Sequence, residues 1–318
     1  MMPPFDQLQF GTTLDIAARS SAGPNPENQD NFLLIDASGN AQFLDGEQLR
    51  QQQVPGWPAG HGRVAVLDGM GGHGHGRQAA EAVVAGLLAL PACMTLAQLS
   101  SALDELHARL QAQFGDDTDR DMRPGTTLTM LELRPGQAAL LYHVGDSRLY
   151  EIGAGEASPL TIDHVPATTY AMQGLIDEGE WWRQVHFEYR SQISQAFILG
   201  NAFSNPGELS DELCALSPLN LPPFLYHLPD RRVLELDPAA VYVLATDGFW
   251  ACGAPDSWVA RWPQLFEGKR NAAEMCDALF DEMQLRPPPV LHPDNLSAIV
   301  LRSRLADETA LPTDIKIV

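Results

Sequence analysis

The stretch TTLTMLELRPGQAALLYHV, residues 126–144, decides the fold class. Two runs rich in Thr, Leu, Val and Tyr, at 126–133 and 138–144, flank the segment Arg134-Pro135-Gly136-Gln137. Such runs are typical of β-strands, and a Pro-Gly pair between them is typical of a turn. Parallel strands need a much longer crossover, so the stretch predicts an antiparallel hairpin. A wholly parallel sheet is therefore disfavoured.

Hydrophobic periodicity predicts further strands and helices around this hairpin. Short apolar runs bounded by Gly, Asp or Pro predict strands at 31–35, 63–67, 241–245 and 296–301. Apolar residues at spacings of three and four, or a high alanine content, predict helices at 77–90, 96–114 and 275–283. Two stretches fit neither pattern. We expect 36–62 to be a long hairpin loop and the proline-rich segment 201–238 to be a surface loop.

The composition excludes several functional classes. The chain has 318 residues, of which 45% are hydrophobic, and a formal net charge of −21. This length allows one large domain or two ordinary ones, with enough apolar residues for a core that needs no disulfides. Nucleic acid is bound through Lys and Arg, so we expect no nucleic-acid partner for so acidic a chain. The surplus carboxylates form a solvated surface or, in part, bind divalent cations.

Cysteine usage and terminal sequence predict a cytoplasmic location. The four cysteines are scattered and form no CxxC pair, so neither a disulfide framework nor a zinc site is expected. The N-terminal residues 1–6 have no basic segment or apolar run of a signal peptide. The longest apolar stretch, 79–90, contains Glu81 and is shorter than the roughly 20 residues of a membrane span. We therefore expect reduced thiols and no membrane partner.

Five aspartates stand beside predicted strands and point to a metal centre. Three follow strands (Asp68, Asp146, Asp247) and two precede strands (Asp30, Asp294). The end of one antiparallel strand and the start of its neighbour lie at the same sheet edge, so these carboxylates could converge. Mg²⁺ or Mn²⁺ would neutralise them, and two such ions can share a hydroxide that attacks phosphorus. Any one of these aspartates could equally be a turn residue; the set of five favours a metal site.

The glycine loop at 69–74 allows two interpretations. It matches GxGxxG between a predicted strand and helix, as in dinucleotide-binding proteins. Asp68 would place negative charge beside a pyrophosphate, and no strand ending in an acid follows about 20 residues later, which opposes that interpretation. We favour glycines that let the backbone approach metal ions, with the Gly69 carbonyl as a ligand. His73 and His75 lack a third metal-binding partner nearby and remain candidates for proton transfer.

An ordered set of motifs resembles the metal-dependent serine/threonine protein phosphatases of type 2C, bacterial branch. The motifs are Asn28-Gln29-Asp30, Asp68-Gly69-Met70-Gly71-Gly72-His73, Gly125-Thr126-Thr127, Val144-Gly145-Asp146-Ser147-Arg148, Leu160-Thr161-Ile162-Asp163-His164, Thr246-Asp247-Gly248 and Asp294-Asn295. The resemblance implies an α+β fold in which two antiparallel β-sheets form a central sandwich flanked by α-helices. It implies one phosphatase domain over residues 1–318, with a core at about 11–304, a flap at about 163–200 and the Pro-rich loop at about 201–238.

The resemblance also implies a site and a reaction. Two Mn²⁺ or Mg²⁺ ions, with a weak third, would be held at positions that match this chain's Asp68 (bridging), Gly69 (carbonyl), Asp247 and Asp294 (first ion), Asp30 (second ion, through water) and Asp146 (third ion). Phosphoserine and phosphothreonine would then be hydrolysed by a metal-bridging hydroxide, without a protein nucleophile. The implied partners are phosphorylated proteins, including a serine/threonine kinase or its targets.

Several positions depart from the family pattern. Asn25 stands where the family usually has a phosphate-clamping Arg, and an amide cannot replace that charged fork. Arg19 on an adjacent strand is a candidate substitute. Gln29 and Ala251 replace acids that often assist metal binding. The alternative is therefore a weak or inactive phosphatase-like regulatory or binding module. Trp181 and other flap aromatics either pack the flap onto the body or form a docking surface for phosphoproteins.

Overall fold

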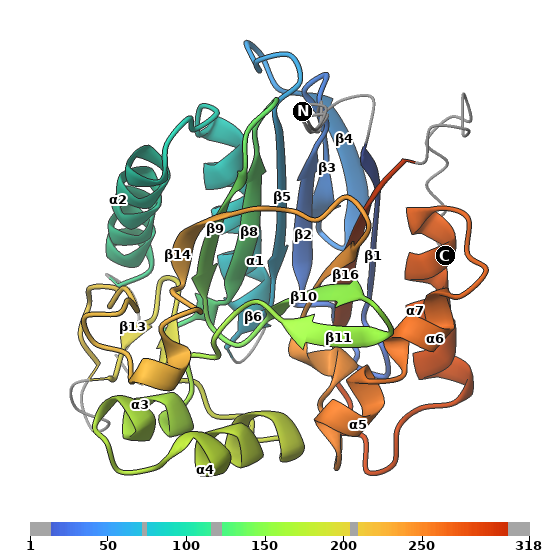
Figure 1. Cartoon of the computed structure of the whole chain (residues 1–318). Helices are drawn as coiled ribbons and strands as arrows, with labels where there is room; N and C mark the ends of the chain where they lie inside the picture. The colour runs from blue at the N-terminus through green and yellow to red at the C-terminus, as the bar shows by residue number, and fades with distance from the viewer. Residues whose placement is uncertain (1–13, 72–74, 116–122, 204–208, 305–318) are drawn as a thin grey trace, which may run out of the picture.

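Two antiparallel β-sheets lie face to face, with helices against both outer faces (Figure 1). The computed structural model describes residues 14–71, 75–115, 123–203 and 209–304. The five-stranded sheet has the order β1 (Leu14–Ser21), β16 (Leu296–Ser303), β15 (Val241–Ala245), β10 (Arg148–Gly153), β11 (Glu156–Pro159). The seven-stranded sheet has the order β14 (Arg231–Leu234), β9 (Ala139–Val144), β8 (Leu128–Leu133), β5 (Gly62–Leu67), β2 (Asn31–Ile35), β3 (Asn40–Asp45), β4 (Gln48–Gln53).

Strand periodicity explains the sandwich. Side chains alternate between the faces of a strand, so a strand covered on both sides is apolar throughout. In β2, Phe32 and Leu34 face the other sheet, where they join a buried cluster with Leu244 and Ile299. Leu33, between them, faces the helices. The predicted fold class is thereby confirmed.

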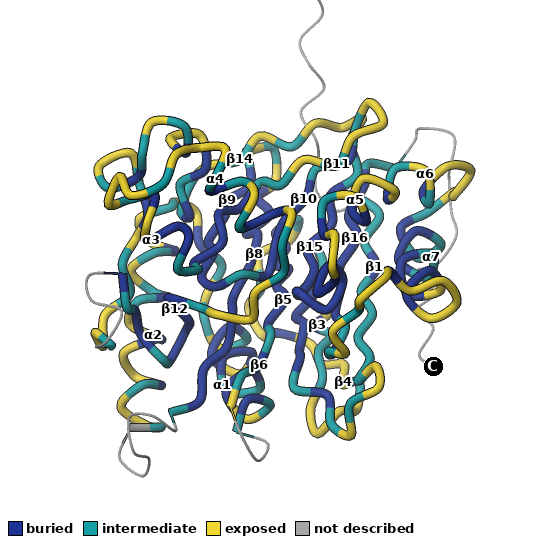
Figure 2. The backbone as a smooth tube through the Cα atoms, turned by 90° about the horizontal axis from the view of Figure 1, so that it is seen from below, coloured by how far each residue is buried: buried dark blue, intermediate teal, exposed yellow. Residues whose placement is uncertain are grey.

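Helices cover the two outer faces. The seven-stranded sheet carries α1 (His75–Ala89) and α2 (Leu96–Gly115), and the five-stranded sheet carries α5 (Pro255–Val259), α6 (Trp262–Phe266) and α7 (Ala272–Leu285). Gly86 lets the first two helices approach closely, because a Cβ there would lie 2.4 Å from Leu106 Cδ1. Figure 2 shows the buried central strands inside a more exposed periphery. No helix in the described ranges is long and apolar enough to cross a membrane.

The decisive hairpin forms as predicted, but two other predictions need correction. Strands β8 and β9 pair antiparallel, with Leu128 opposite Val144. The predicted strand at 126–133 is split, because β7 (Gly125–Thr126) pairs separately with β6 (Gly69–Met70). The stretch 36–62 is not a long loop: it contains β3 and β4, joined by Gly46 and Glu47, which both have positive φ. This two-residue connection suits a tight hairpin.

A lobe below the sheets in Figure 1 contains the segment that resembles a flap. It includes α3 (Pro166–Met172), α4 (Glu178–Trp182), the π-helical turn η3 (Arg183–Phe187), β12 (Gln195–Ala196) and β13 (Gly200–Asn201). The Pro-rich segment is more than a surface loop, because it contains the 3-10 turn η4 (Pro223–Leu225) and β14. Its Leu216 and Leu225 are buried in the lobe's apolar core beside Trp181.

Candidate metal centre

The five aspartates lie at one edge of the two sheets. Asp68 follows β5, Asp146 connects β9 to β10, and Asp247 begins the 3-10 turn η5 (Asp247–Phe249) after β15. Asp30 directly precedes β2, and Asp294 lies two residues before β16. Burial raises the pKa of Asp68 well above its usual value, and the charges of the other four aspartates raise it further. The structure therefore brings these five carboxylates together.

Backbone contacts fix the loop that carries Asp68. Its N–H donates to Thr127 Oγ1 at 2.9 Å, and the Thr127 N–H donates to the Asp68 carbonyl at 2.9 Å. Gly145, beside Asp146, has φ +111° and lies so close that a Cβ would approach Thr127 Cγ2 to 2.6 Å. Thr127 thus sets the spacing between the two acidic loops.

Asn295 connects the remaining loops. Its Oδ1 accepts the Gln29 N–H at 2.8 Å, and its Nδ2 donates to the carbonyls of Ala22 and Glu27 at 2.9 Å. The turn after β15 packs directly against Asn295, since a Cβ on Gly248 would lie 2.0 Å from the Asn295 carbonyl oxygen. The loops that carry three of the five aspartates are therefore stacked on one another.

Two of the carboxylates are buried and have defined partners. Asp30 Oδ2 accepts the Thr246 hydroxyl at 2.8 Å. Asp247 Oδ2 accepts the Tyr189 hydroxyl at 2.8 Å, whereas its Oδ1 is buried without a hydrogen-bond partner. A buried, unpaired carboxylate oxygen is costly, and a cation is a ligand that would satisfy it.

The electrostatics of the site favour a bound cation. Burial raises the pKa values of Asp30 and Asp146 well above normal, and burial together with the charge of Asp247 raises the pKa of Asp294 to about 6. In the described ranges, no group of three or more His, Cys, Asp or Glu side chains is already arranged around an ion-sized space. The unpaired Asp247 Oδ1 is an oxygen donor of the kind that Mg²⁺ and Mn²⁺ prefer, and waters can complete the shell of such an ion, so the donor set fits them.

The glycine loop at 69–74 lets the backbone at Gly69 pack directly against neighbouring backbone. A Cβ on Gly69 would lie 2.4 Å from the carbonyl oxygens of both Gln29 and Gly76, so only glycine fits. His75 begins α1, and His73 lies outside the described residues. The dinucleotide interpretation is wrong, because β5 is paired antiparallel with both β2 and β8. The parallel strands of a dinucleotide-binding unit are not formed there.

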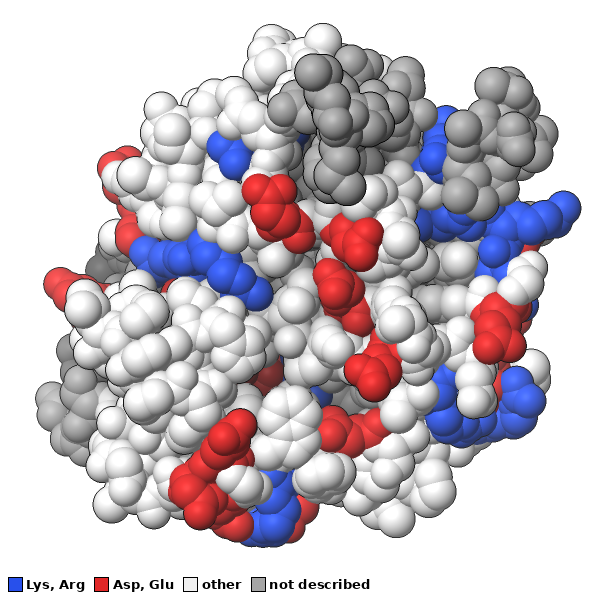
Figure 3. Space-filling model, in the orientation of Figure 1, with Lys and Arg blue, Asp and Glu red and all other residues white. Residues whose placement is uncertain are grey.

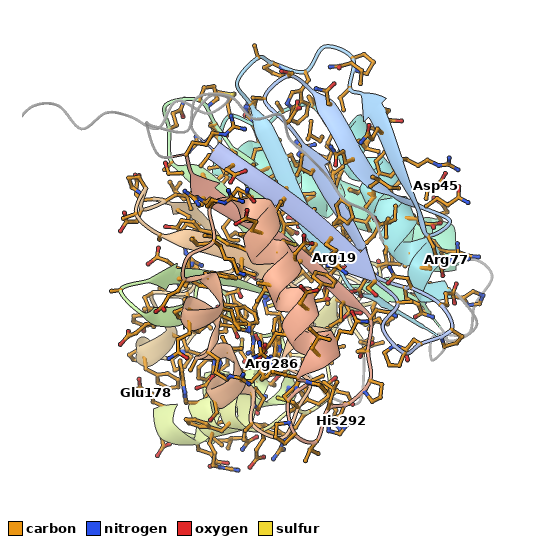
Figure 4. All side chains as sticks on the ribbon, turned by 90° about the vertical axis from the view of Figure 1, so that its right-hand side faces the viewer. Arg19, Asp45, Arg77, Glu178, Arg286 and His292 are labelled. Atoms are coloured by element: carbon orange, nitrogen blue, oxygen red, sulfur yellow. The ribbon has the colours of Figure 1, made fainter. Side chains whose placement is uncertain are left out.

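The Arg19 side chain contacts α7 in this structure. Its Nη1 lies 3.1 Å from Asp277 Oδ1, and its guanidinium lies 4.5 Å from the centre of the Phe280 ring, both on α7. Figure 4 shows Arg19 beside this helix. Arg19 shares a face of β1 with Ala17, which packs into the α7 core. The assignment of Arg19 to phosphate binding stays a prediction. Asn25 lies half-buried in the loop before Asp30.

The flap aromatics have mainly structural roles. Trp181 is only 1% exposed, and its Nε1 donates to Thr168 Oγ1 at 3.0 Å. Trp182 stacks on His186 with ring centres 4.1 Å apart and donates to Asp256 Oδ2 at 3.0 Å, which connects the lobe to α5. Of the two alternatives for Trp181, its burial favours packing of the flap over a docking surface.

Comparison with known proteins agrees with this geometry. No family model matches the chain. The curated serine/threonine protein phosphatase PstP of Mycobacterium tuberculosis is 37% identical over 125 residues, which are 38% of this chain and 23% of PstP. The crystal structure of M. tuberculosis PstP matches with a TM-score of 0.60 at 25% identity and covers 92% of this chain and 100% of that structure. The chain is therefore similar in sequence and fold to the bacterial serine/threonine phosphatases of type 2C.

Two other structures extend the comparison of this type 2C fold. The PstP catalytic domain, described in complex with two manganese ions, has a TM-score of 0.58 at 24% identity over 92% of this chain and 99% of that one. PppA, described as a key regulatory component of T6SS in Pseudomonas aeruginosa, has a TM-score of 0.59 at 20% identity over 92% of this chain and 98% of that one. At these identities the likeness supports the fold.

Proposed function

We propose that this protein is a protein-serine/threonine phosphatase that uses two Mn²⁺ or Mg²⁺ ions. The observation that carries the proposal is the convergence of five carboxylates at one sheet edge, with a buried Asp247 oxygen left unpaired. The proposed ligands are Asp68, Asp247, Asp294 and the Gly69 carbonyl, with Asp30 acting through water and Asp146 at a weak third site. The family name carried by PstP supports the same reaction class.

In the proposed mechanism, side chains of this chain hold the metal ligands in place, and the bound ions would activate water. When bound, the ions would lower the pKa of a shared water and offset charge on the phosphoryl oxygens, so that hydroxide attacks phosphorus. Thr127 holds the Asp68 loop through two backbone-anchored hydrogen bonds. Thr246 orients Asp30 through its hydroxyl. These fixed hydrogen bonds reduce reorganisation during the reaction.

A second candidate is a weak or inactive regulatory module. It is favoured by Asn25 at the clamp position and by the engagement of Arg19 with Asp277. Retention of all five aspartates in converging positions favours activity instead. Asn25 in place of a charged Arg should lower the affinity for phosphate, but it leaves the proposed metal ligands intact. We therefore propose an active enzyme with a high KM.

The test is an assay of the purified chain on p-nitrophenyl phosphate and on a phosphothreonine peptide. We expect activity with Mn²⁺, loss of activity with a chelator, and loss in Asp247→Asn. Asp237→Asn is a matched control, because Asp237 is an exposed aspartate before β15, at the opposite end of that strand from Asp247. Activity that survives the chelator or Asp247→Asn contradicts the metal mechanism. Inactivity at every Mn²⁺ concentration favours the regulatory module.

The proposed partners are phosphorylated proteins, including a serine/threonine kinase or its targets. Figure 3 shows acidic side chains in a band across one face, with basic side chains mainly at its sides. With a net charge of −21, the protein should favour phosphopeptides with basic flanking residues. Faster turnover of acidic peptides at low salt would contradict this preference. The cytoplasmic location and the assignment of 163–200 as the flap of a single phosphatase domain stay predictions.

A further inference from the structure

We propose that Tyr189 is a positioning residue that orients Asp247 for metal binding and connects the flap to occupancy of the metal centre. This inference rests on the proposed function, because it requires that Asp247 bind a cation. It adds a role for a side chain that follows η3 in the lobe, 58 positions before Asp247 in the sequence.

The two carboxylate oxygens of Asp247 have different surroundings. The Tyr189 hydroxyl donates to Oδ2 at 2.8 Å, and Oδ1 is buried without a partner. A carboxylate with one oxygen fixed in this way can present the other in a single orientation. Hydrogen bonds of this kind orient metal ligands, and their loss typically weakens metal binding about 10- to 100-fold.

A second contact joins Tyr189 to the loop that carries Asp294. The Tyr189 ring lies 5.2 Å from the His292 ring, at an interplanar angle of 37°. The His292 N–H in turn donates to the Ala251 carbonyl at 2.7 Å, four residues after Asp247. Figure 4 labels His292, which lies in the segment that follows α7. Tyr189 therefore contacts Asp247 itself and the segment that carries Asp294, two of the proposed ligands of the first ion.

The same residue lines a cavity beside the centre. Asp146 and Asp247 line it from the sheet edge, and Gln184, Tyr189 and Arg190 line it from the lobe. A bound ion that fixes Asp247 should therefore also order the segment around Tyr189. Coupling between sites is reciprocal, so ordering of this segment should in turn strengthen ion binding.

The primary test compares Tyr189→Phe with Tyr170→Phe. Tyr170 lines the same cavity and, among the described residues, makes no hydrogen bond to a proposed ligand. Mn²⁺ binding to chelator-treated full-length protein is measured without substrate, from the electron paramagnetic resonance signal of free Mn²⁺. We expect about tenfold weaker Mn²⁺ binding in Tyr189→Phe and no change in Tyr170→Phe. Phe keeps the ring contact with His292, and an unchanged melting temperature without metal verifies that the variant folds.

A second readout follows the flap itself. Hydrogen exchange of residues 183–194 should slow on adding Mn²⁺ to the wild-type protein, and Tyr189→Phe should lose this protection. The inference is overturned when Tyr189→Phe binds Mn²⁺ as tightly as the wild type. A wild-type protein that binds no Mn²⁺ overturns the proposed function as well, so the two failures are distinguishable. Activity at saturating Mn²⁺ should recover in Tyr189→Phe, because the variant weakens ion binding and not the subsequent chemistry.

Discussion

Replacing Asp294 by Asn should stabilise the metal-free protein at pH 8 while weakening Mn²⁺ binding. Burial and the charge of Asp247 raise the pKa of the Asp294 carboxyl to about 6. At pH 8 the Asp294 carboxylate is therefore ionised, and without a bound cation this ionisation lowers the free energy of unfolding. Asn has nearly the same shape, and its side-chain oxygen can still accept the Asn295 N–H, which donates to Asp294 Oδ1 at 2.8 Å.

The magnitude follows from the pKa. A rise from the ordinary value of 3.8 to about 6 is about two units, or about 3 kcal/mol. Asp294 is only half-buried, so screening by solvent reduces the effect to about 1–2 kcal/mol. That corresponds to a rise in melting temperature of roughly 2–8 °C, at about 2–4 °C per kcal/mol. The folded pKa lies above the unfolded one, so this destabilisation is absent below about pH 4 and grows as the pH rises through 6.

The assay is a thermal melt with chelator and with Mn²⁺, at pH 4.5 and pH 8. Asp294→Asn should melt higher than the wild type with chelator at pH 8, and the difference should shrink at pH 4.5. With saturating Mn²⁺ the order should reverse, because the wild type binds the ion more tightly. The exposed Asp237→Asn serves as the control and should follow the wild type. A lower melting temperature of metal-free Asp294→Asn at pH 8 would show that the ionised Asp294 carboxylate does not destabilise the metal-free fold.

Three further variants test other parts of the structure. Arg148 Nη2 lies 2.7 Å from Asp163 Oδ2 in a buried pair, so Asp163→Ala should cost about 3–5 kcal/mol in urea unfolding; a cost below about 1 kcal/mol would contradict that estimate. Asn25→Arg should lower the KM for p-nitrophenyl phosphate roughly tenfold through a charged hydrogen bond, with unchanged Mn²⁺ affinity, and an unaltered KM would argue against this position as the phosphate clamp. Trp181→Ala should destabilise the chain by about 3–5 kcal/mol and impair aryl phosphate and phosphopeptide hydrolysis equally, whereas a loss confined to the phosphopeptide would revive the docking hypothesis.

Much of the fold was predictable because the central strands are buried on both faces. The runs at 31–35 and 241–245 coincide with β2 and β15, and apolar content alone revealed them. The edge strand β4 escaped prediction, because its sequence QLRQQQ is polar and exposed. Backbone pairing with β3 and a two-residue turn form this strand without an apolar signal.

The site was predictable only where its residues adjoin strands. Asp68 and Asp247 could be identified because Asp68 directly follows an apolar run and Asp247 follows another after one threonine. The contact of the Arg19 side chain with α7 depends on which face of β1 packs against that helix. This contact could not be predicted, because β1 itself was not predicted. The contact of Tyr189 with Asp247 joins residues 58 positions apart, through a lobe whose short helices carry no strong periodicity. Tertiary packing decides such contacts, and local sequence does not encode them.

The most direct test of the metal centre is a crystal structure of the protein grown with MnCl₂, with anomalous data collected near the manganese edge. We expect two strong anomalous peaks at the sheet edge, between Asp68, Asp247 and Asp294, with Asp30 beside the second peak. Asp247→Asn should weaken or remove the first peak. Absence of anomalous density among these carboxylates in Mn²⁺-saturated crystals, or Mn²⁺ bound only elsewhere on the chain, would contradict a metal centre at this sheet edge.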